Sequence, residues 1–148
     1  MNALRQLDTP DGPVLYAVVQ PEDSSSHPGL LLLPAAPQSP AMAQEGLALW
    51  RAAMVADGFV VVCPVAPMEG LFTSAVAHAR LPHLLDHVAT SSPIRGGRWS
   101  LLGICDGGRS ALAVAAAYPE RFHSVTVIPG AVTDPEMLAP LVDLPVTW

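Results

Sequence analysis

Short, continuous apolar runs alternate along the chain with longer segments in which apolar residues recur every three or four positions. Continuous runs bounded by turn residues are typical of strands buried on both faces, whereas the spaced pattern is typical of amphipathic helices. The predicted strands cover residues 13–20, 30–33, 59–63, 99–104, 124–128 and 144–148. The predicted helices cover residues 43–56, 73–90 and a segment after 105 that ends near 118.

This alternation of strands and helices predicts the fold class. Helices of this length between strands imply right-handed crossovers and a mostly parallel sheet covered on both sides, which is a three-layer α/β/α arrangement. The chain has no internal repeat, and its 148 residues with 51% hydrophobic content are enough to bury one core. We therefore expect residues 1–148 to form a single α/β domain.

Local signals set the ends of the predicted helices. In the first helix, Leu47, Trp50 and Met54 lie at spacings that place them on one face, and Gly58 follows the end of the helix. Pro82 falls inside the second helical region. Because proline suits a first helical turn better than an interior, we expect that region to break or restart near Pro82.

A glycine-rich turn follows the predicted strand 99–104. The turn reads G-I-C-D-G-G, with Gly103 two residues before Cys105 and Gly107 two residues after it. This spacing fits a nucleophile elbow, in which a strand reverses sharply into a helix and holds the central side chain out from the sheet edge. Gly103 and Gly107 remove side chains that would collide at the apex, and Gly108 lets the helix approach its strand.

Cys105 is the candidate nucleophile of this turn. It would lie at a helix N-terminus, where free backbone N–H groups stabilise a thiolate and an oxyanion. The neighbouring carboxylate of Asp106 acts against a thiolate, so the sequence leaves the state of the sulfur open. The alternative interpretation is a buried cysteine that ends a core strand, because free cysteine packs like a small hydrophobic residue.

Composition narrows the classes of function. The net charge of −6, with only 7 Lys and Arg residues, disfavours a surface for nucleic acid or anionic membranes, since both need clustered basic residues. We find no apolar run with the pattern of a signal peptide or the length of a membrane span. Cys63 and Cys105 form neither a metal-ligand spacing nor a disulfide framework. We expect a cytoplasmic protein that acts on a small molecule without a metal or cofactor.

Several segments together resemble the α/β-hydrolase superfamily, especially its small esterases and dienelactone hydrolases. They read A-D-G-F-V-V-V-C-P at 56–64, A-Y-P-E-R-F at 117–122 and S-V-T-V-I-P-G at 124–130, on either side of the cysteine turn. Cysteine in place of serine at the elbow resembles the dienelactone-hydrolase variant. The resemblance implies an ester or lactone hydrolase with Cys105 as nucleophile. It also places one strand between Cys63 and Cys105, which disfavours a disulfide.

The loop after the strand 30–33 departs from the family pattern. The family has a His-Gly pair at this position, whereas this chain has Pro34-Ala35-Ala36-Pro37. An oxyanion hole would then be formed by the backbone N–H of Asp106 with that of Ala35 or Ala36, provided that the donors converge on one point. A purely structural proline-rich turn is the alternative.

The acid and the histidine of the family's catalytic triad have no counterpart at their usual places. In the family they follow the nucleophile in the order nucleophile, acid, histidine. Residues 144–148 resemble the start of the strand that carries the acid. The resemblance therefore implies that the C-terminal part with both residues is missing, and that a base would come from a second copy, a complementing chain or an internal histidine.

The internal histidines and one loop acid are the candidate substitutes for the missing base. His83 and His87 share a helix face, but no third metal ligand accompanies them, so we interpret them as solvated. His27 falls in a polar loop, and His123 falls on the side of the sheet away from the strand carboxyl ends. Glu69 follows the strand 59–63 toward the same edge as Cys105, and we interpret it as a solvated loop acid.

Three functional hypotheses remain open at this point. The first is a thiol-dependent hydrolase of carboxylic esters or lactones. The second is a catalytically incomplete hydrolase-like domain that acts in binding or assembly, including self-association, through an open side of its sheet. The third is a class I glutamine amidotransferase, which also has a G-x-C-x-G turn; Arg109 stands where those enzymes have glutamine, which favours the hydrolase.

Overall fold

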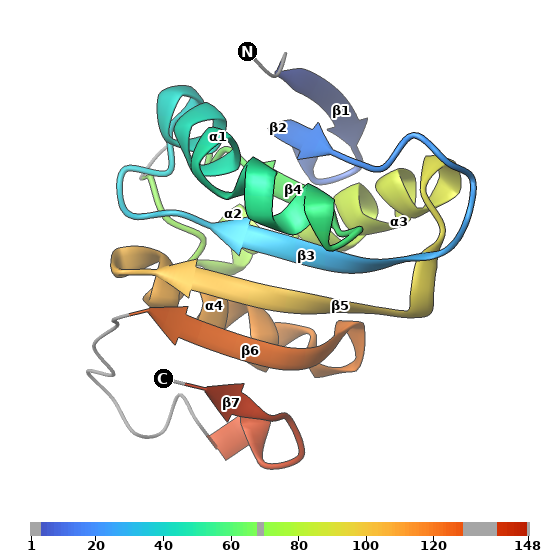
Figure 1. The fold of residues 1–148 in the computed structure, drawn as a ribbon. Coiled ribbons are helices and arrows are strands. Elements are labelled where there is room, and N and C mark those ends of the chain that lie inside the picture. Colours follow the sequence, from blue (N-terminus) through green and yellow to red (C-terminus); the bar gives the residue numbers. More distant parts are fainter. Residues whose placement is uncertain (1–3, 68–69, 129–138, 148) are drawn as a thin grey trace.

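In the computed structural model, residues 4–67, 70–128 and 139–147 are described (Figure 1). The described strands form one sheet in the order β1-β2-β4-β3-β5-β6-β7. The strands are β1 (Arg5–Thr9), β2 (Gly12–Val19), β3 (His27–Leu33), β4 (Val60–Pro64), β5 (Ile94–Ile104), β6 (Phe122–Ile128) and β7 (Val146–Thr147). The helices are α1 (Pro40–Ala56), α2 (Ala75–His78), α3 (Leu81–Ser91) and α4 (Asp106–Ala117), with a 3-10 turn η1 (Pro119–Arg121).

The sheet is mostly parallel, as the sequence predicts. β4, β3, β5, β6 and β7 run parallel to one another, and β1 and β2 form an antiparallel hairpin at one edge. β1 was not among the predicted strands, because its segment R-Q-L-D-T is mostly polar and exposed. Parallel pairing brings the carboxyl ends of β3, β5 and β6 to the same edge of the sheet, with Leu33 opposite Gly103 and Gly103 opposite Val127.

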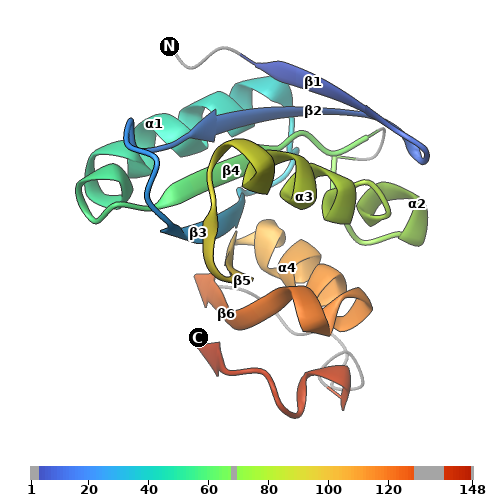
Figure 2. The ribbon, with the colours of Figure 1, turned by 90° about the vertical axis from the view of Figure 1, so that its right-hand side faces the viewer.

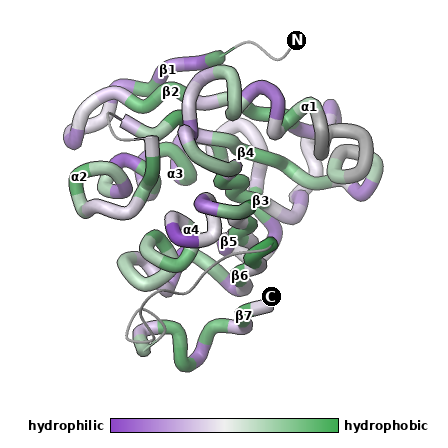
Figure 3. The backbone as a smooth tube through the Cα atoms, turned by 90° about the vertical axis from the view of Figure 1, so that its left-hand side faces the viewer, coloured by the Kyte–Doolittle hydropathy of each residue, from purple (hydrophilic) through white to green (hydrophobic). Residues whose placement is uncertain are grey.

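Helices cover both faces of the sheet, with α1 on one face and α3 and α4 on the other (Figures 1 and 2). The four consecutive leucines of β3 show why both faces are needed. Successive side chains of a strand point to opposite faces, so Leu30 and Leu32 pack on the α1 side and Leu31 and Leu33 on the α3 and α4 side. Figure 3 shows this continuous hydrophobic character along β4 and the second half of β3.

One predicted boundary is confirmed by the structure, and another is wrong. The region 73–90 divides into α2 and α3, and Pro82 lies in the first turn of α3, which confirms the predicted restart. β5 begins at Ile94, five residues before the predicted start at Trp99, because Ile94 pairs with His27 before the register shifts to Trp99. Among the described residues, no helix is both long enough and apolar enough to cross a membrane.

His78 links α2 to the end of α4. The residue is 9% exposed, and its Nδ1 lies 3.3 Å from the Tyr118 hydroxyl. The two rings meet edge to face, with centroids 5.5 Å apart. Burial lowers the pKa of His78 from its ordinary value of 6.5, because a buried ring carries a positive charge less readily.

We expect the free energy of unfolding to fall as the pH drops below 6.5 toward the lower pKa of folded His78. In that interval the unfolded chain binds a proton at His78 and the folded chain does not. The stability that comes from keeping His78 neutral in the fold is therefore complete above the pKa of the unfolded chain and is lost as the pH falls toward the pKa of the folded chain. His78→Phe keeps an aromatic ring against Tyr118 but cannot titrate, and should flatten this part of a urea-unfolding profile. His83→Gln, at an exposed histidine, is the control; an equally steep profile for His78→Phe would contradict the assignment.

Candidate active site at the carboxyl edge of the sheet

Cys105 is the single residue between β5 and α4. Its φ of 54° and ψ of −120° make it the one non-glycine residue with a positive φ in the described part of the chain. Such a conformation costs about 1–3 kcal/mol and persists only where the surrounding structure enforces it. The side chain is exposed, so the interpretation of Cys105 as a packed core residue is wrong. The sharp turn that the sequence predicts is present, and its cysteine faces solvent.

Two backbone hydrogen bonds hold the turn. The N–H of Cys105 donates to the carbonyl oxygen of Ile128 at the end of β6, with a distance of 2.7 Å. The carbonyl oxygen of Cys105 accepts from the N–H of Gly108 at 2.9 Å. The strained residue is therefore anchored to the neighbouring strand on one side and to its own helix on the other.

The glycines explain how closely the turn packs. A Cβ atom on Gly103 would lie 2.5 Å from the carbonyl oxygen of Gly107 and 2.6 Å from the Cα of Gly108. A Cβ atom on Gly107 would overlap the carbonyl oxygens of Leu33 and Pro34. Only hydrogen fits at either position, because the obstacles are backbone atoms that cannot move away as a flexible side chain would.

The same packing brings the candidate oxyanion donors toward the turn. Leu33 pairs with Gly103, so the segment that follows Leu33 leaves the sheet beside the segment that leads into Cys105. Ala35 is half-buried and Ala36 is exposed. In the hydrogen bonds of the described residues, the N–H groups of Ala35, Ala36 and Asp106 have no acceptor. The first N–H groups of a helix lack intrahelical partners, so the Asp106 donor is available for a ligand.

Sequence reasoning missed two buried polar residues beside this edge, Gln38 and Ser110. Both side chains have an exposed fraction of 0%, and the Ser110 hydroxyl lies 3.4 Å from Oε1 of Gln38. The sequence held one signal for Ser110, since it is a polar residue on a helix face otherwise made of alanine, leucine and valine. That signal could not identify Gln38 as the partner, because 72 positions separate the two residues in the sequence.

The histidines lie away from Cys105. His27 and His123 sit near the amino ends of β3 and β6, where Nε2 of His123 lies 3.2 Å from the Ser100 hydroxyl. This confirms the predicted position of His123 at the opposite side of the sheet. His78 contacts Tyr118 beyond the last turn of α4, and 12 residues place the two ends of that helix about 18 Å apart.

The two remaining histidines belong to α3. His83 lies 3.2 Å from the Asp11 carboxylate, and the ring of His87 meets that of Tyr16 edge to face. Both are exposed. The described residues contain no group of three His, Cys, Asp or Glu side chains that could hold a metal ion. Glu69 lies outside the described residues.

Comparison with known proteins gives structural likeness alone, because no protein-family model and no curated protein matches the sequence. A thermostable esterase superposes with a TM-score of 0.79 at 15% identity, over 98% of this chain and 45% of that one. The chain has the α/β-hydrolase fold. An α/β-hydrolase-fold protein from Nakamurella multipartita (TM-score 0.66, 18% identity) is matched over 92% of this chain and 47% of that chain.

An acetyl xylan esterase from Aspergillus awamori shares this α/β-hydrolase fold, with a TM-score of 0.64 at 20% identity. The match covers 87% of this chain and 52% of the esterase. The chain thus spans about half of the length of the α/β hydrolases that it resembles. Structural matches at such low identity show the arrangement of strands and helices alone. The chemistry depends on the residues of the site.

The strand order of the α/β-hydrolase fold also separates the two cysteines. Cys63 is in β4, Cys105 follows β5, and β3 lies between them. Both thiols are free, as predicted. Cys63 has an exposed fraction of 0%, and this burial raises the pKa of its thiol well above the ordinary range. The molecule therefore holds one accessible thiol and one inert thiol.

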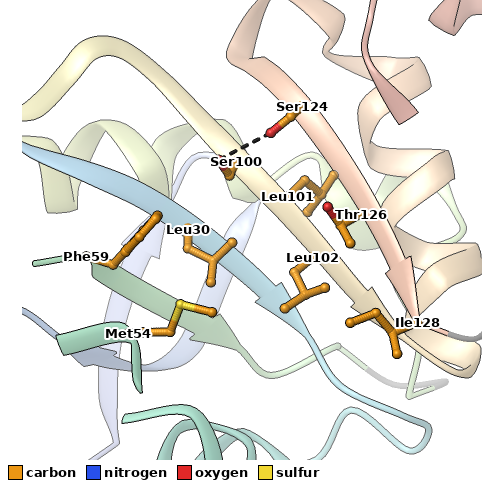
Figure 4. A pocket seen from close by; sticks show the side chains of 9 residues that line it. All are labelled: Leu30, Met54, Phe59, Ser100, Leu101, Leu102, Ser124, Thr126 and Ile128. Carbon is orange, nitrogen blue, oxygen red and sulfur yellow. Dashed lines mark hydrogen bonds between the residues drawn. The ribbon is translucent and has the colours of Figure 1, made fainter. Parts of the chain in front are cut away.

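A groove of about 250 Å³ lies on the α1 face of the sheet, over β5 and β6 (Figure 4). Its apolar walls come from the sheet and from α1, and they include Leu30, Met54, Phe59, Leu102 and Ile128. The hydroxyls of Ser100 and Ser124 in the groove are 3.3 Å apart and bond to each other. None of the residues that line the groove carries a charge. The groove offers apolar contact, and Cys105 is not among the residues that line it.

Alkylation should distinguish the two thiols. We expect iodoacetamide to label Cys105 in the native protein and to label Cys63 more than about 100-fold more slowly, because a core strand must open before its thiol reacts. Intact mass and peptide mapping would show one label without denaturant and two labels in urea. Equal labelling of both cysteines in the native protein would contradict the placement of Cys63 in the core.

A pair of glycine-to-alanine substitutions tests the packing of the elbow. Gly107→Ala places a methyl group on the backbone of Leu33 and Pro34, and should destabilise the fold by more than about 3 kcal/mol. Gly46→Ala, in α1, meets nothing nearer than 3.6 Å and should stabilise by about 0.5–1 kcal/mol. Urea unfolding measures both. A stable Gly107→Ala protein would show that the backbone contact is looser than described.

Proposed function

We propose that Cys105 is the nucleophile of an α/β hydrolase that acts on carboxylic esters or lactones, in the manner of dienelactone hydrolases. The observation that carries this proposal is an exposed cysteine at a positive φ between β5 and α4. Packing gives no reason for a cysteine at an exposed position, and the strained backbone aims its side chain away from the sheet edge. The esterase names of the structural neighbours point to the same class of substrate.

The chemistry has two steps. In the first, Sγ of Cys105 attacks the carbonyl carbon of the ester, and the carbonyl electron pair moves onto the oxygen. The oxyanion accepts hydrogen bonds from the N–H of Asp106 and from that of Ala35 or Ala36. The carbonyl then re-forms and the C–O bond to the alcohol breaks, and the alcohol leaves with the proton that the base took from the Cys105 thiol. In the second step, water attacks the thioester, and the acid leaves as the thiol is restored.

This proposal requires a base that no described histidine places beside Cys105. All five histidines of the chain lie in the described ranges. We propose that the base and its acid partner come from a second copy or from a complementing chain. Without them, the first step is slow and the thioester accumulates, because water in the second step lacks a base to activate it. A covalent adduct is therefore the expected readout for this chain.

Other features of the protein fit a thiol hydrolase. A cysteine nucleophile must stay reduced, which agrees with a cytoplasmic location. The acidic chain offers no clustered basic surface for nucleic acid, so the proposed partner is a small ester or lactone, with no metal or cofactor. A role in binding or assembly alone would not require a strained cysteine, and the α/β-hydrolase fold favours the hydrolase over the amidotransferase.

Acylation of the chain by p-nitrophenyl acetate tests the proposal. We expect one acetyl group per chain by intact mass, on Cys105, with release of p-nitrophenolate in a single turnover. Cys105→Ala should remove the adduct and reduce the release at least about 100-fold, to the rate of the buffer. Cys63→Ala is the matched control, because it removes the other thiol and should keep the adduct.

Two results would count against a nucleophilic Cys105. One is a folded wild-type chain that gains no acetyl group at any pH at which the chain stays folded. The other is a Cys105→Ala protein that releases p-nitrophenolate as fast as the wild type. Circular dichroism of each variant would establish that the comparison is made between folded proteins.

A further inference from the structure

Gln38 is a buried amide with a partner for every polar group. Its backbone N–H donates to Gly70 at 2.7 Å, and its carbonyl oxygen accepts from Ala66 at 2.8 Å. Its side-chain Nε2 donates to the carbonyl oxygen of Pro34 at 2.8 Å, and its Oε1 lies 3.4 Å from the Ser110 hydroxyl, which donates to it. An amide with 0% exposure costs free energy unless it is bonded in this way, so its geometry is tightly specified.

The bond from Gln38 to Pro34 closes a loop around the candidate oxyanion donors. The two residues are four positions apart, and Ala35 and Ala36 lie between them. Pro34 and Pro37 also restrict the backbone on either side of the alanines. The direction in which the Ala35 and Ala36 N–H groups point is therefore set by this closed loop.

The bond from Gln38 to Ser110 ties the same loop to the nucleophile helix. Ser110 is four residues after Asp106 in α4, so the two lie on one side of the helix, one turn apart. The Ser110 hydroxyl also accepts from the N–H of Phe72 at 3.0 Å, which fixes its position. A buried chain of hydrogen bonds thus runs from Pro34 through Gln38 and Ser110 to the helix that carries the Asp106 donor.

We propose that Gln38, together with Ser110, is a positioning residue that holds the Ala35 and Ala36 amides in register with the Asp106 amide. This inference rests on the proposed function, because it assigns those amides to an oxyanion. Oxyanion donors act at about 2.7–3.1 Å, and a displacement of about 1 Å costs on the order of 100-fold in rate. Gln38 itself is buried beneath the loop and acts through the donors.

Gln38→Met tests this role, because methionine keeps the unbranched shape and loses both side-chain hydrogen bonds. We expect acylation of Cys105 by p-nitrophenyl acetate to slow by about 10- to 100-fold, because it passes through an oxyanion. Alkylation of Cys105 by iodoacetamide forms no oxyanion and should change by less than about twofold. An equal loss in both reactions would assign Gln38 a purely structural role and overturn the proposal, as would unchanged acylation.

Variants at Ser110 and Ser39 keep the test decisive if Gln38→Met does not fold. Ser110→Ala breaks the link to α4 and should slow acylation without slowing alkylation, and Ser110→Thr, which keeps the hydroxyl, should restore acylation. Ser39→Ala is the matched control in the same loop. The Ser39 hydroxyl accepts from the N–H of Met42 at 3.3 Å, whereas the Gln38 side chain bonds to Pro34 and Ser110, so acylation should stay within about twofold.

A readout independent of activity separates this inference from the proposed function. Backbone N–H order parameters of Ala35 and Ala36, measured by NMR relaxation, should fall from about 0.85 in the wild type to below about 0.6 in Gln38→Met. If the wild type is not acylated, the proposed function fails, and the order parameters alone decide whether Gln38 holds the loop. If they do not change, the positioning role fails even in a chain that is acylated.

Discussion

The site depends on one contact between two stretches of backbone. Gly107, in the first turn of α4, lies directly on the carbonyl oxygens of Leu33 and Pro34, with no room for a side chain between them. Because of this contact, the end of β3 and the start of α4 meet at the same point of the sheet edge. It places Cys105 at the apex and the Asp106 amide at the helix start, and the segment with Ala35 and Ala36 leaves β3 from the pairing of Leu33 with Gly103.

Near this contact, the buried polar side chains provide hydrogen-bond partners for buried backbone groups. Pro34, which follows β3, is buried, and an unpaired carbonyl oxygen at a buried position costs free energy. Gln38 supplies the donor for Pro34 and takes its own acceptor bond from Ser110 on α4. The strained φ at Cys105 is held by its bond to Ile128. The hydrogen bonds that pair these buried groups are therefore the same ones that we propose hold the candidate oxyanion donors.

Most of the fold could be predicted from the sequence, because it follows from local patterns. The four leucines of β3 and the glycine spacing around Cys105 identify the parallel strands and the turn between strand and helix. β1 escaped prediction because an exposed edge strand carries little hydrophobic signal. The Gln38–Ser110 pair could not be predicted, since contacts between distant positions leave no local signature. The α/β-hydrolase fold is shared with two esterases at 15% and 20% identity, so the arrangement of strands and helices is alike although most side chains differ.

The most direct test of the central claim is a crystal structure of the chain after Cys105 has reacted with a trifluoromethyl ketone. The hemithioketal oxygen stands in for the oxyanion of the proposed reaction. The account predicts that this oxygen lies about 2.7–3.1 Å from the N–H nitrogen of Asp106 and from that of Ala35 or Ala36, with Cys105 still at a positive φ. An oxygen that faces solvent without a backbone donor, or a Cys105 with a negative φ, would contradict it.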